Sequence, residues 1–265
     1  MACQALNRWG TPAQKADWLP GLAAGRTIGA FALSEPEAGS DARAVGTVLT
    51  PDGDDLRLDG VKKWISFGQR ADLFLVVAKL DSRIATLLVP RDTPGLSVTA
   101  IRNLLGFRSA MLAEIHFHDC RLPRANLIGS TDFGLAQVVG SVLSHGRFCI
   151  AWGAVGVAQA CLDASLDYAR QRVQFGQPIG MHQLVQHKIA DMITDTRAAR
   201  LLCREAAAQL AAGHPEMIMS TVVAKYFAAA AAERIAADAV QLHGANGCTE
   251  DFPVQRQLRD AKILN

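Results

Sequence analysis

The sequence predicts an α+β protein in which an antiparallel β domain is followed by a bundle of helices. Two features support this prediction. From residue 27 to residue 123, short runs rich in β-branched and aromatic residues alternate with turn signals, and no helical pattern interrupts them. After Gly129 the chain changes to long stretches rich in alanine and leucine, which are strong helix formers. With a short helical segment before the strands, the expected domains are residues 1–26, 27–125 and 126–265.

The segment before the strands should be the end of a helix and a loop, with runs over residues 4–10 and 14–19. Thr11 and Pro12 stand between them. Threonine followed by proline is typical of a helix N-cap and of the first helical position, where the missing N–H of proline is not needed. We therefore expect a helix to begin at this pair.

Seven strands are expected in the second part. Residues 112–118 alternate apolar and polar side chains with the period of two that a half-buried strand requires. Turn signals at residues 51–54 and 93–95 separate neighbouring runs. Short strands joined by tight turns favour an antiparallel or barrel-like sheet. The expected strands are residues 27–33, 44–50, 55–66, 72–80, 83–90, 96–101 and 112–119.

Three long helices are expected in the third part, over residues 134–173, 181–212 and 217–243. Pro215 stands just before the third helix and Gly244 just after it, as is typical of helix ends. Because alanine is small, helices this rich in alanine can approach one another closely. The third part is therefore expected to be an antiparallel helical bundle.

Composition and charge exclude several classes of protein. Half of the 265 residues are hydrophobic and a fifth are charged, so the chain is neither disordered nor collagen-like. The formal net charge of +2 lacks the basic excess of a nucleic-acid-binding protein. No apolar run is expected to reach the length of a membrane span, and the first residues do not resemble a signal peptide. We expect a cytoplasmic protein with no nucleic-acid and no membrane partner.

Common catalytic and metal-binding motifs are missing. The six cysteines show no CxxC spacing, so we expect reduced core residues rather than disulfides or zinc ligands. The seven histidines do not fall at ligand spacings with carboxylates, and no metal site is expected. The signatures of a nicotinamide-binding Rossmann domain, a P-loop enzyme and a serine hydrolase are also missing, which argues against these three classes.

Two segments carry the chemistry that the sequence does show. Residues 31–41, FALSEPEAGSD, run from a strand into a turn whose backbone N–H groups and hydroxyls suit a flat polar heterocycle or a phosphate. An ordinary turn stabilised by serine and aspartate has the same local pattern. Residues 60–66, GVKKWIS, put a tryptophan and a hydroxyl on a strand, although a tryptophan taken alone is more often part of a core. The local patterns leave both interpretations open.

Taken together, these two segments resemble the flavin-contacting signature of the acyl-CoA dehydrogenase family. Residues 146–192 resemble that family's long C-terminal helix and its Arg-x-x-Phe-Gly turn, and residues 241–263 resemble its final block. The motifs follow the family's order and cover nearly the whole chain. The resemblance implies N-terminal helices, of which residues 1–26 are a remnant, then a middle β domain and a C-terminal four-helix bundle. It also implies a homotetramer, or a dimer, with FAD at the subunit interfaces.

By this resemblance FAD is the cofactor of a flavoprotein oxidoreductase. The residues implied to contact the isoalloxazine and its linker are Phe31, Leu33, Ser34, Gly39 and Ser40 on one side, with Trp64 and Ser66 on the other. The residues implied to grip the adenosine diphosphate part from a neighbouring subunit are the segment Arg172, Val173 and Gln174, with Phe175, His182 and Gln183. Those at the adenine-side turn are Gln241, His243 and Gly244. A permanently charged guanidinium also suits a pyrophosphate on chemical grounds.

The implied substrate is an acyl thioester, carried by coenzyme A or by an acyl-carrier protein. Ser40, Ser144 and Arg147 are implied to lie on the substrate side, with Arg147 near the pantetheine or the ribose. The family often has an aspartate where this chain has Ser144, which leaves room for a carrier protein. The sequence of this helix faintly resembles that of relatives that oxidise carrier-bound acyl groups in polyketide extender-unit pathways.

The family reaction takes the α-proton with a carboxylate and passes the β-hydrogen as hydride to flavin N5. The implied electron acceptor is an electron-transferring flavoprotein or, in some relatives, oxygen. Neither family position for the base holds a carboxylate here, because one falls beyond residues 259–263 and the other is Gly146. The acids that remain belong to structural stretches of the family pattern, so the catalytic base stays unassigned; they are Glu35, Glu250, Asp251 and Asp260.

Measured against the family pattern, the chain starts late and stops early. We therefore expect it to be the middle of a longer protein, with weak or no dehydrogenase turnover on its own. Two other interpretations stay open. One is a family member, or a subunit of a mixed tetramer, that binds flavin or an acyl carrier without chemistry, and the other is a flavin oxidase or monooxygenase on the same fold.

Overall fold

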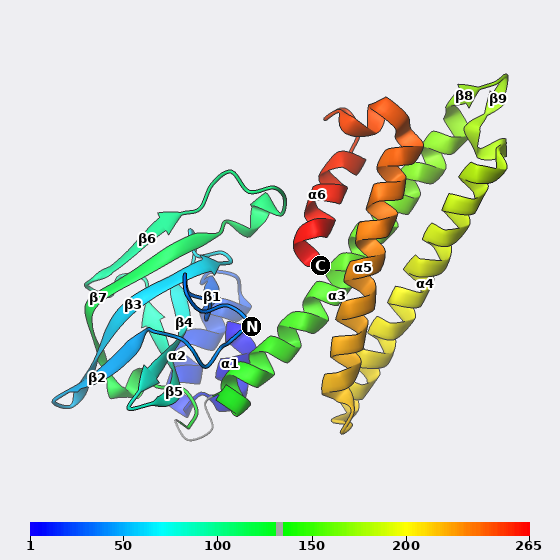
Figure 1. Cartoon of the computed structure of the whole chain (residues 1–265). Helices are drawn as coiled ribbons and strands as arrows, with labels where there is room; N and C mark the ends of the chain where they lie inside the picture. Colours follow the sequence, from blue (N-terminus) through cyan, green and yellow to red (C-terminus); the bar gives the residue numbers. More distant parts are fainter. Residues whose placement is uncertain (131–134) are drawn as a thin grey trace. The chain divides into compact units, whose positions relative to one another are not determined.

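The chain folds into two compact units, which the computed structural model describes over residues 1–130 and 135–265 (Figure 1). The first unit consists of Met1–Leu104 and Arg108–Leu143, and the second of Leu105–Phe107 and Ser144–Asn265. The short N-terminal helices and the sheet therefore belong to one unit, and most of the long helices to the other.

Two short helices, α1 (Ala2–Trp9) and α2 (Pro12–Ala23), open the first unit. Thr11 is the N-cap of α2. Its hydroxyl accepts a hydrogen bond from the Gln14 N–H at 3.2 Å, and its own N–H donates to the Gln14 side chain at 3.0 Å. This reciprocal capping box confirms the expected start of the second helix.

All seven expected strands form, and they belong to one sheet in the order β1-β4-β2-β3-β7-β6, with β5 paired to β4. They are β1 (Gly29–Ala32), β2 (Val48–Asp52), β3 (Asp55–Ile65), β4 (Leu73–Leu80), β5 (Arg83–Pro90), β6 (Leu96–Ala100) and β7 (Ala113–Pro123). Two pairs, β1–β4 and β2–β4, are parallel, so the sheet is mixed rather than antiparallel throughout. Parallel pairs need a crossover connection, which is usually a helix. Here the loop of residues 33–47 joins β1 to β2, which both pair with β4, and the connection on to β4 runs through β3 instead of a helix. The loop has no periodicity that would predict the crossover.

Strand β4 is covered on both faces. Phe74 and Val76 pack in a core with residues of β3 and β7. Leu73 and Leu75 point the opposite way and pack with Leu6 of α1. A strand buried on both faces has a nearly continuous apolar sequence, as β4 does.

The second unit is helical. Its long helices are α3 (Gly140–Gln171), α4 (Gln183–Ala212) and α5 (Met217–His243), followed by α6 (Val254–Leu264). The first three confirm the expected long helices, although the expected first residue, 134, lies outside the described residues. Gly213 and Gly244 end α4 and α5 at positive φ, which glycine adopts without strain. Helix α6 lies in a segment for which the local pattern predicted no separate helix.

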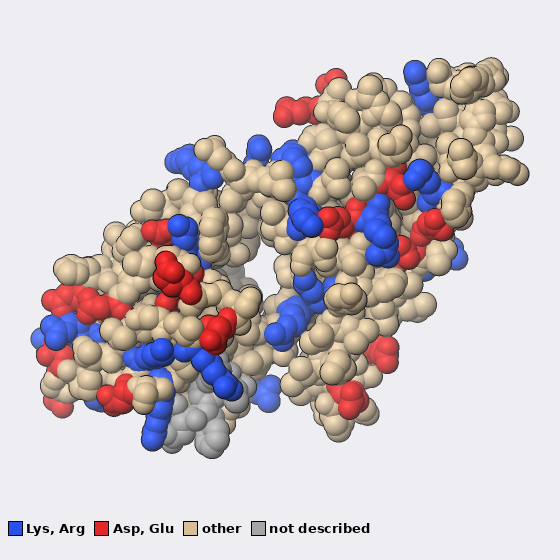
Figure 2. All heavy atoms as spheres, viewed as in Figure 1, with Lys and Arg blue, Asp and Glu red and all other residues tan. Residues whose placement is uncertain are grey.

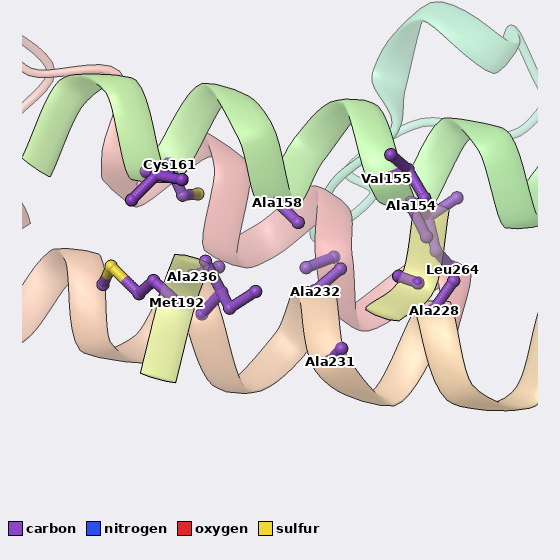
Figure 3. Packing of buried hydrophobic residues seen from close by; sticks show 14 of the residues in the cluster. Ala154, Val155, Ala158, Cys161, Met192, Ala228, Ala231, Ala232, Ala236 and Leu264 are labelled. Atoms are coloured by element: carbon purple, nitrogen blue, oxygen red, sulfur yellow. The ribbon is translucent and has the colours of Figure 1, made fainter. Parts of the chain in front are cut away.

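Small residues line the contact between α3 and α5. Ala154 and Ala158 of α3 lie opposite Ala228 and Ala232 of α5 in the core of the bundle (Figure 3). All four side chains are fully buried. Because alanine keeps the contact surface thin, the two helix backbones can approach closely, as the composition predicted.

The helical stretch that contains α3, Gln137–Gln171, is 35 residues long, and its most apolar window has a mean hydropathy of 1.4. By length and composition alone this is enough to cross a membrane. The expectation that no apolar run reaches that length is therefore wrong. The core helix of a helical bundle has the same length and composition, and Ala154 and Ala158 pack in such a core.

Half of the cysteines are core residues. Cys120, Cys161 and Cys203 are buried, whereas Cys3, Cys149 and Cys248 are exposed, so the expectation of core positions is wrong for the second three. All six are free thiols. Burial raises the pKa of Cys161 to about 12 and that of Cys203 to about 11, which keeps these two thiols protonated and unreactive.

Acidic and basic side chains are interspersed on the face of each unit that Figure 2 shows. Several form ion pairs. Arg121 Nε lies 2.9 Å from Asp55 Oδ2 in the first unit, and Arg234 Nη2 lies 2.9 Å from Asp195 Oδ2 in the second. Such surface pairs contribute about 0–1 kcal/mol each to stability. The small net charge thus reflects mixed signs rather than a scarcity of charged residues.

Candidate functional site

The residues that the sequence singles out fall into two groups, one in each unit. The first group lies in the turn after β1 and at the end of β3, and consists of Phe31, Leu33, Ser34, Gly39, Ser40, Trp64 and Ser66. The second group lies on the helices and the turns that follow them, and consists of Ser144, Arg147, Arg172, Val173, Gln174, Phe175, His182, Gln183, Gln241, His243 and Gly244.

The turn after β1 presents its outer residues to open space. Ser34 is half-buried, and Gly39 and Ser40 are exposed. A Cβ built on Gly39 would meet no atom within 4 Å, so there is room for a ligand beside it. Leu33 is buried and Phe31 is half-buried, and both pack against the apolar core of the first unit. The polar members of the predicted set are thus accessible, while Leu33 belongs to the core.

A bulge near the end of β3 turns Trp64 outward. The register between β3 and β7 shifts between Lys62 and Ile65, and Trp64 has a positive φ of 64°. The Trp64 side chain is 52% exposed, and the Lys63 ammonium lies 5.4 Å from the centroid of its ring. Ser66, two residues further on, is also exposed. Trp64 is therefore not a core residue, and its aromatic face is available to a flat ligand.

Three contacts join the turn to β3. The Lys63 N–H donates to the Ser34 carbonyl at 2.8 Å. The Lys62 ammonium donates to the Leu33 carbonyl at 2.9 Å and lies 2.6 Å from Glu35 Oε1. The two segments that the sequence singled out separately are therefore neighbours in the structure.

Lys62 and Glu35 form a buried ion pair that the sequence analysis did not predict. Burial lowers the pKa of Lys62 to about 8, and the hydrogen bond and charge of Glu35 only partly oppose this shift. Burial acts to raise the pKa of Glu35. Hydrogen bonds from Lys62, Thr47 and Gly46 outweigh it, so the pKa of this carboxyl lies below its ordinary value. Both groups are therefore charged at neutral pH.

In the second unit, five of the predicted residues line one pocket of about 250 Å³; they are Arg172, Gln174, Gln241, His243 and Gly244. The pocket lies where the end of α3 meets the end of α5 and the following 3₁₀ turn, Gly244–Cys248. A Cβ built on Gly244 would meet no atom within 4 Å, so a ligand can approach the backbone closely there. A guanidinium beside an open backbone suits a phosphate group.

His243 is held firmly in the wall of this pocket. Its ring stacks on Tyr168, with 4.3 Å between ring centroids, and Phe252 packs edge-on against both rings. Burial lowers the pKa of His243, although its Nδ1, 2.8 Å from the Ala239 carbonyl, opposes the shift. Asn246 donates a hydrogen bond to the Tyr168 hydroxyl at 2.9 Å. His243 is thus a neutral, packed histidine, and Tyr168 and Asn246 are pocket residues that the sequence analysis missed.

Phe175, His182 and Gln183 are not among the residues that line this pocket. The short strands β8 (Val173–Gln174) and β9 (Gln177–Pro178) form a hairpin. Phe175 lies in its turn and is 94% exposed. Its ring contacts that of His182 edge-on, with 5.9 Å between centroids. Of the residues around this hairpin that the resemblance implied, Arg172 and Gln174 line the pocket.

Ser144 and Arg147 lie three residues apart on α3, so their side chains leave the same side of the helix. Ser144 is buried and Arg147 is half-buried. Gly146, between them, offers no functional group. This stretch of α3 therefore provides a guanidinium, a hydroxyl and the imidazole of His145, but no carboxylate.

The four acids that the sequence offers as bases have structural roles or lie in water. Glu35 is enclosed by its hydrogen-bond donors. Asp260 Oδ1 accepts a hydrogen bond from the Phe107 N–H at 2.5 Å. Glu250 and Asp251 are exposed. None of the four combines an accessible oxygen with the dry surroundings that strengthen a carboxylate base.

The described residues fit the chemistry of FAD. The exposed Trp64 ring offers an apolar face, and the hydroxyl-bearing turn at Ser34 and Ser40 offers hydrogen bonds to a flat, polar ring system. The Arg172 pocket offers positive charge and close backbone approach at Gly244. Over residues 1–130 and 135–265, no group of three or more His, Cys, Asp or Glu residues is placed to hold a metal ion.

Sequence families match both parts of the chain. The family described as "Acyl-CoA dehydrogenase, middle domain" matches residues 30–120, and the family described as "Acyl-CoA dehydrogenase, C-terminal domain" matches residues 133–265. The chain is 40% identical over 265 residues to YngJ of Bacillus subtilis (strain 168), named a probable acyl-CoA dehydrogenase. That match covers 98% of this chain and 69% of YngJ.

Solved structures share the fold. Butyryl-CoA dehydrogenase from Megasphaera elsdenii matches with a TM-score of 0.95 and 34% identity, over 99% of this chain and 70% of that one. The prolyl acyl carrier protein oxidase AnaB matches with a TM-score of 0.94 and 31% identity, over 98% of this chain and 70% of that one. The chain thus spans somewhat more than two thirds of the length of these three proteins.

Proposed function

Since the chain belongs to the acyl-CoA dehydrogenase family of FAD-dependent oxidoreductases, we propose that it binds FAD and acts in the α,β-dehydrogenation of an acyl thioester. The observation that carries the proposal is the hydrogen bond from the Lys63 N–H to the Ser34 carbonyl, which makes the turn and the Trp64 strand neighbours. Bound FAD would supply the acceptor for the hydride that leaves the β-carbon.

The chain's own residues bind and orient the cofactor. Ser34 and Ser40 hydrogen-bond the polar edge of the ring system, and Trp64 covers a face of it and keeps water away. Arg172 binds the pyrophosphate through its forked N–H donors, and Gly244 lets the backbone approach it. Support for these roles comes from the exposure of Trp64 and from the pocket that Arg172 and Gly244 share.

We assign none of the four available acids as the base that takes the α-proton. A base must place an oxygen within hydrogen-bond reach of that proton. The oxygens of Glu35 and Asp260 are engaged by structural donors, and Glu250 and Asp251 lie in water. Dehydrogenation by these 265 residues should therefore be slow, even where FAD binds well.

The proposed carrier of the acyl group is coenzyme A or an acyl-carrier protein. Both carry a phosphopantetheine, whose phosphate suits the Arg147 guanidinium. The similar proteins include both kinds of carrier in their names, since the Megasphaera elsdenii protein is a butyryl-CoA dehydrogenase and AnaB is a prolyl acyl carrier protein oxidase. Ser144, which is uncharged, leaves room for either carrier.

We also propose an electron-transferring flavoprotein as the acceptor and a homo-oligomer, dimer or tetramer, as the working form. Large apolar side chains exposed on α4 and α5 support the oligomer, because association would remove them from water; they are Leu184, Leu201, Ile218, Val223 and Tyr226. Light scattering on the FAD-loaded protein should give the mass of two or four chains. A monomer at all concentrations would contradict this part of the proposal.

Anaerobic titration tests the proposed reaction. The FAD-loaded protein is mixed with an acyl-CoA and, separately, with the matching acyl-carrier protein, and the flavin absorbance is followed. We expect slow bleaching by one of the two thioesters. Bound flavin that neither thioester bleaches would support a binding protein without chemistry. Bleaching followed by peroxide release in air would favour an oxidase, the activity that the name of AnaB states.

A further inference from the structure

The buried ion pair of Lys62 and Glu35 joins the turn next to Ser34 to strand β3, two residues before Trp64. The Lys62 side chain is fully buried, and its ammonium donates hydrogen bonds to the Glu35 carboxylate and the Leu33 carbonyl. Its neighbour Lys63 donates its backbone N–H to Ser34. Consecutive residues of β3 are thus tied to consecutive residues of the turn.

The pair also fixes a third segment. Glu35 accepts hydrogen bonds from the Gly46 N–H at 2.5 Å, and from the Thr47 N–H at 3.0 Å and hydroxyl at 2.6 Å. Strand β3 can approach Thr47 only because residue 60 is glycine. A Cβ there would lie 2.6–2.8 Å from Thr47 atoms, and its φ of +147° is one that other residues rarely adopt. Three segments therefore converge on one carboxylate.

Stability alone does not account for such a pair. The cost of removing two charges from water is about as large as their attraction, so a buried ion pair often contributes no more than a well-packed apolar pair. The pair instead restricts how the three segments can be arranged. A carboxylate with four donors and an ammonium with two acceptors can be satisfied in only one arrangement of the turn, the loop at Thr47 and β3.

That arrangement sets the direction of Trp64. The residue holds a positive φ of 64°, which a bulky side chain keeps only where its surroundings enforce it. The bulge begins directly after Lys62, the last residue of β3 in regular register before the shift to Ile65. The Lys62 anchor therefore fixes the strand just before it turns Trp64 out to solvent.

We propose that the Glu35–Lys62 pair is a positioning pair of the flavin site, which sets the spacing between the Ser34 turn and the Trp64 ring and thereby the affinity for FAD. The inference rests on the proposed function above. Neither charged group is exposed, so the pair does not touch the ligand. It acts through Ser34 and Trp64, which do.

The test separates positioning from stability by removing both charges together. In the double variant Glu35→Gln/Lys62→Met no unpaired charge stays buried, so the urea midpoint of the apoprotein should stay close to that of the wild type. The FAD dissociation constant, measured by titration of flavin fluorescence, should nevertheless rise about tenfold or more, because the site is no longer pre-organised. Hydrogen exchange at the Lys63 N–H should also become faster, since its Ser34 partner is released.

Arg57→Met is the matched control. Arg57 is on β3, as Lys62 is, and forms an exposed ion pair with Asp119 of β7, with 3.3 Å between the charged atoms. Breaking this pair should leave the FAD dissociation constant unchanged. Should the double variant fail to fold, Glu35→Asp is measured instead. It keeps the charge but shortens the side chain by one methylene, and the same rise in dissociation constant is expected.

The outcomes are distinguishable. The first outcome is that the wild type binds FAD and that the folded double variant, or Glu35→Asp where that variant is used, binds it equally well. This result would overturn the positioning role and leave the proposed function intact. Absence of FAD binding by the folded wild type would overturn the proposed function, and this inference with it. The supporting result is that the double variant binds FAD more weakly while its urea midpoint stays unchanged. The FAD affinity of Arg57→Met must stay the same. This combination would show that the pair positions the site.

Discussion

The Glu35 carboxylate accepts four hydrogen bonds, from the Lys62 ammonium, the N–H and hydroxyl of Thr47, and the N–H of Gly46. Burial acts to raise its pKa, but these donors lower it below its ordinary value. The unfolded chain offers none of these donors. Ionised Glu35 therefore stabilises the folded state, and this contribution depends on pH.

We predict that Glu35→Gln removes this pH-dependent contribution. Because the folded pKa lies below the ordinary 4.5, the contribution is fully present above pH 4.5 and is lost as the pH falls through the folded pKa. Above pH 4.5 the variant should be less stable by about 3–5 kcal/mol, since Lys62 becomes an unpaired buried charge. Urea denaturation at a series of pH values measures the difference, which should shrink in acid.

Glu37→Gln is the control for this prediction, because Glu37 is an exposed carboxylate of the same turn. Its free energy of unfolding should stay within about 0.5 kcal/mol of the wild type at every pH. A Glu35→Gln penalty that stays constant from neutral pH into acid would show that the carboxylate is not ionised in the folded protein.

A second prediction concerns Arg172. Arg172→Lys keeps the positive charge but loses the forked pair of N–H donors that fits a pyrophosphate. The FAD dissociation constant should rise about tenfold, which corresponds to about 1.4 kcal/mol. Arg170→Lys is the control, since Arg170 pairs with Asp167 on the helix surface and does not line the pocket. Equal FAD affinity for both variants would remove Arg172 from the site.

Sequence patterns identified Ser34 and Trp64 but not Lys62, which anchors the turn to β3. Lys62 sits at an inward position of an alternating strand, yet a lysine is normally assigned to solvent, and its partner Glu35 is 27 residues away. Tyr168 and Asn246 were missed for a similar reason. They become pocket residues only when the ends of α3 and α5 meet, which local patterns do not encode.

The positions of the strands along the chain could be predicted from the sequence. Whether neighbouring strands pair parallel or antiparallel could not. The alternation and turn signals around β7 fixed its period and its face. Nothing in β1 or β2 showed that both run parallel to β4, because hydrophobic periodicity is the same for parallel and antiparallel neighbours. The loop of residues 33–47 begins the crossover from β1 to β4 and contains the Ser34 turn, so the unpredicted connection is also the one that forms the candidate site.

Among the helices, two glycines should respond in opposite ways to alanine. Gly106 packs against α6, and a Cβ there would lie 2.3 Å from the Arg259 carbonyl oxygen. Gly106→Ala should therefore displace the loop and lower the free energy of unfolding by about 1–3 kcal/mol. Gly153, in the interior of α3, has open space around its Cβ position. Gly153→Ala should raise the free energy of unfolding by about 0.5–1 kcal/mol.

Urea denaturation of both variants checks this pair of predictions. The two substitutions add the same methyl group, so a difference of sign comes from the surroundings of each glycine. Equal effects would contradict the close packing of the loop at Gly106 against Arg259 and Asp260 in the second unit.

For the molecule as a whole, the order of motifs along the chain indicated more about the fold and the function than any single pattern did. Composition and periodicity predicted a sheet followed by long helices, and the structure confirms that order. The flavin and the thioester came only from the family resemblance, because a turn with two serines or an exposed tryptophan has no unique ligand. Each unit contributes one of the two predicted groups of residues, and the account assigns both groups to FAD binding.

Binding of FAD to the folded 265-residue protein tests that account most directly. Circular dichroism first verifies helix and strand content, and equilibrium dialysis with excess FAD then measures the bound flavin. We predict one FAD per chain, retained through gel filtration as a yellow protein, and weaker retention in Arg172→Lys. A folded, correctly assembled protein that stays colourless and retains no FAD would contradict the assignment of the Ser34 turn, the Trp64 strand and the Arg172 pocket to a flavin site.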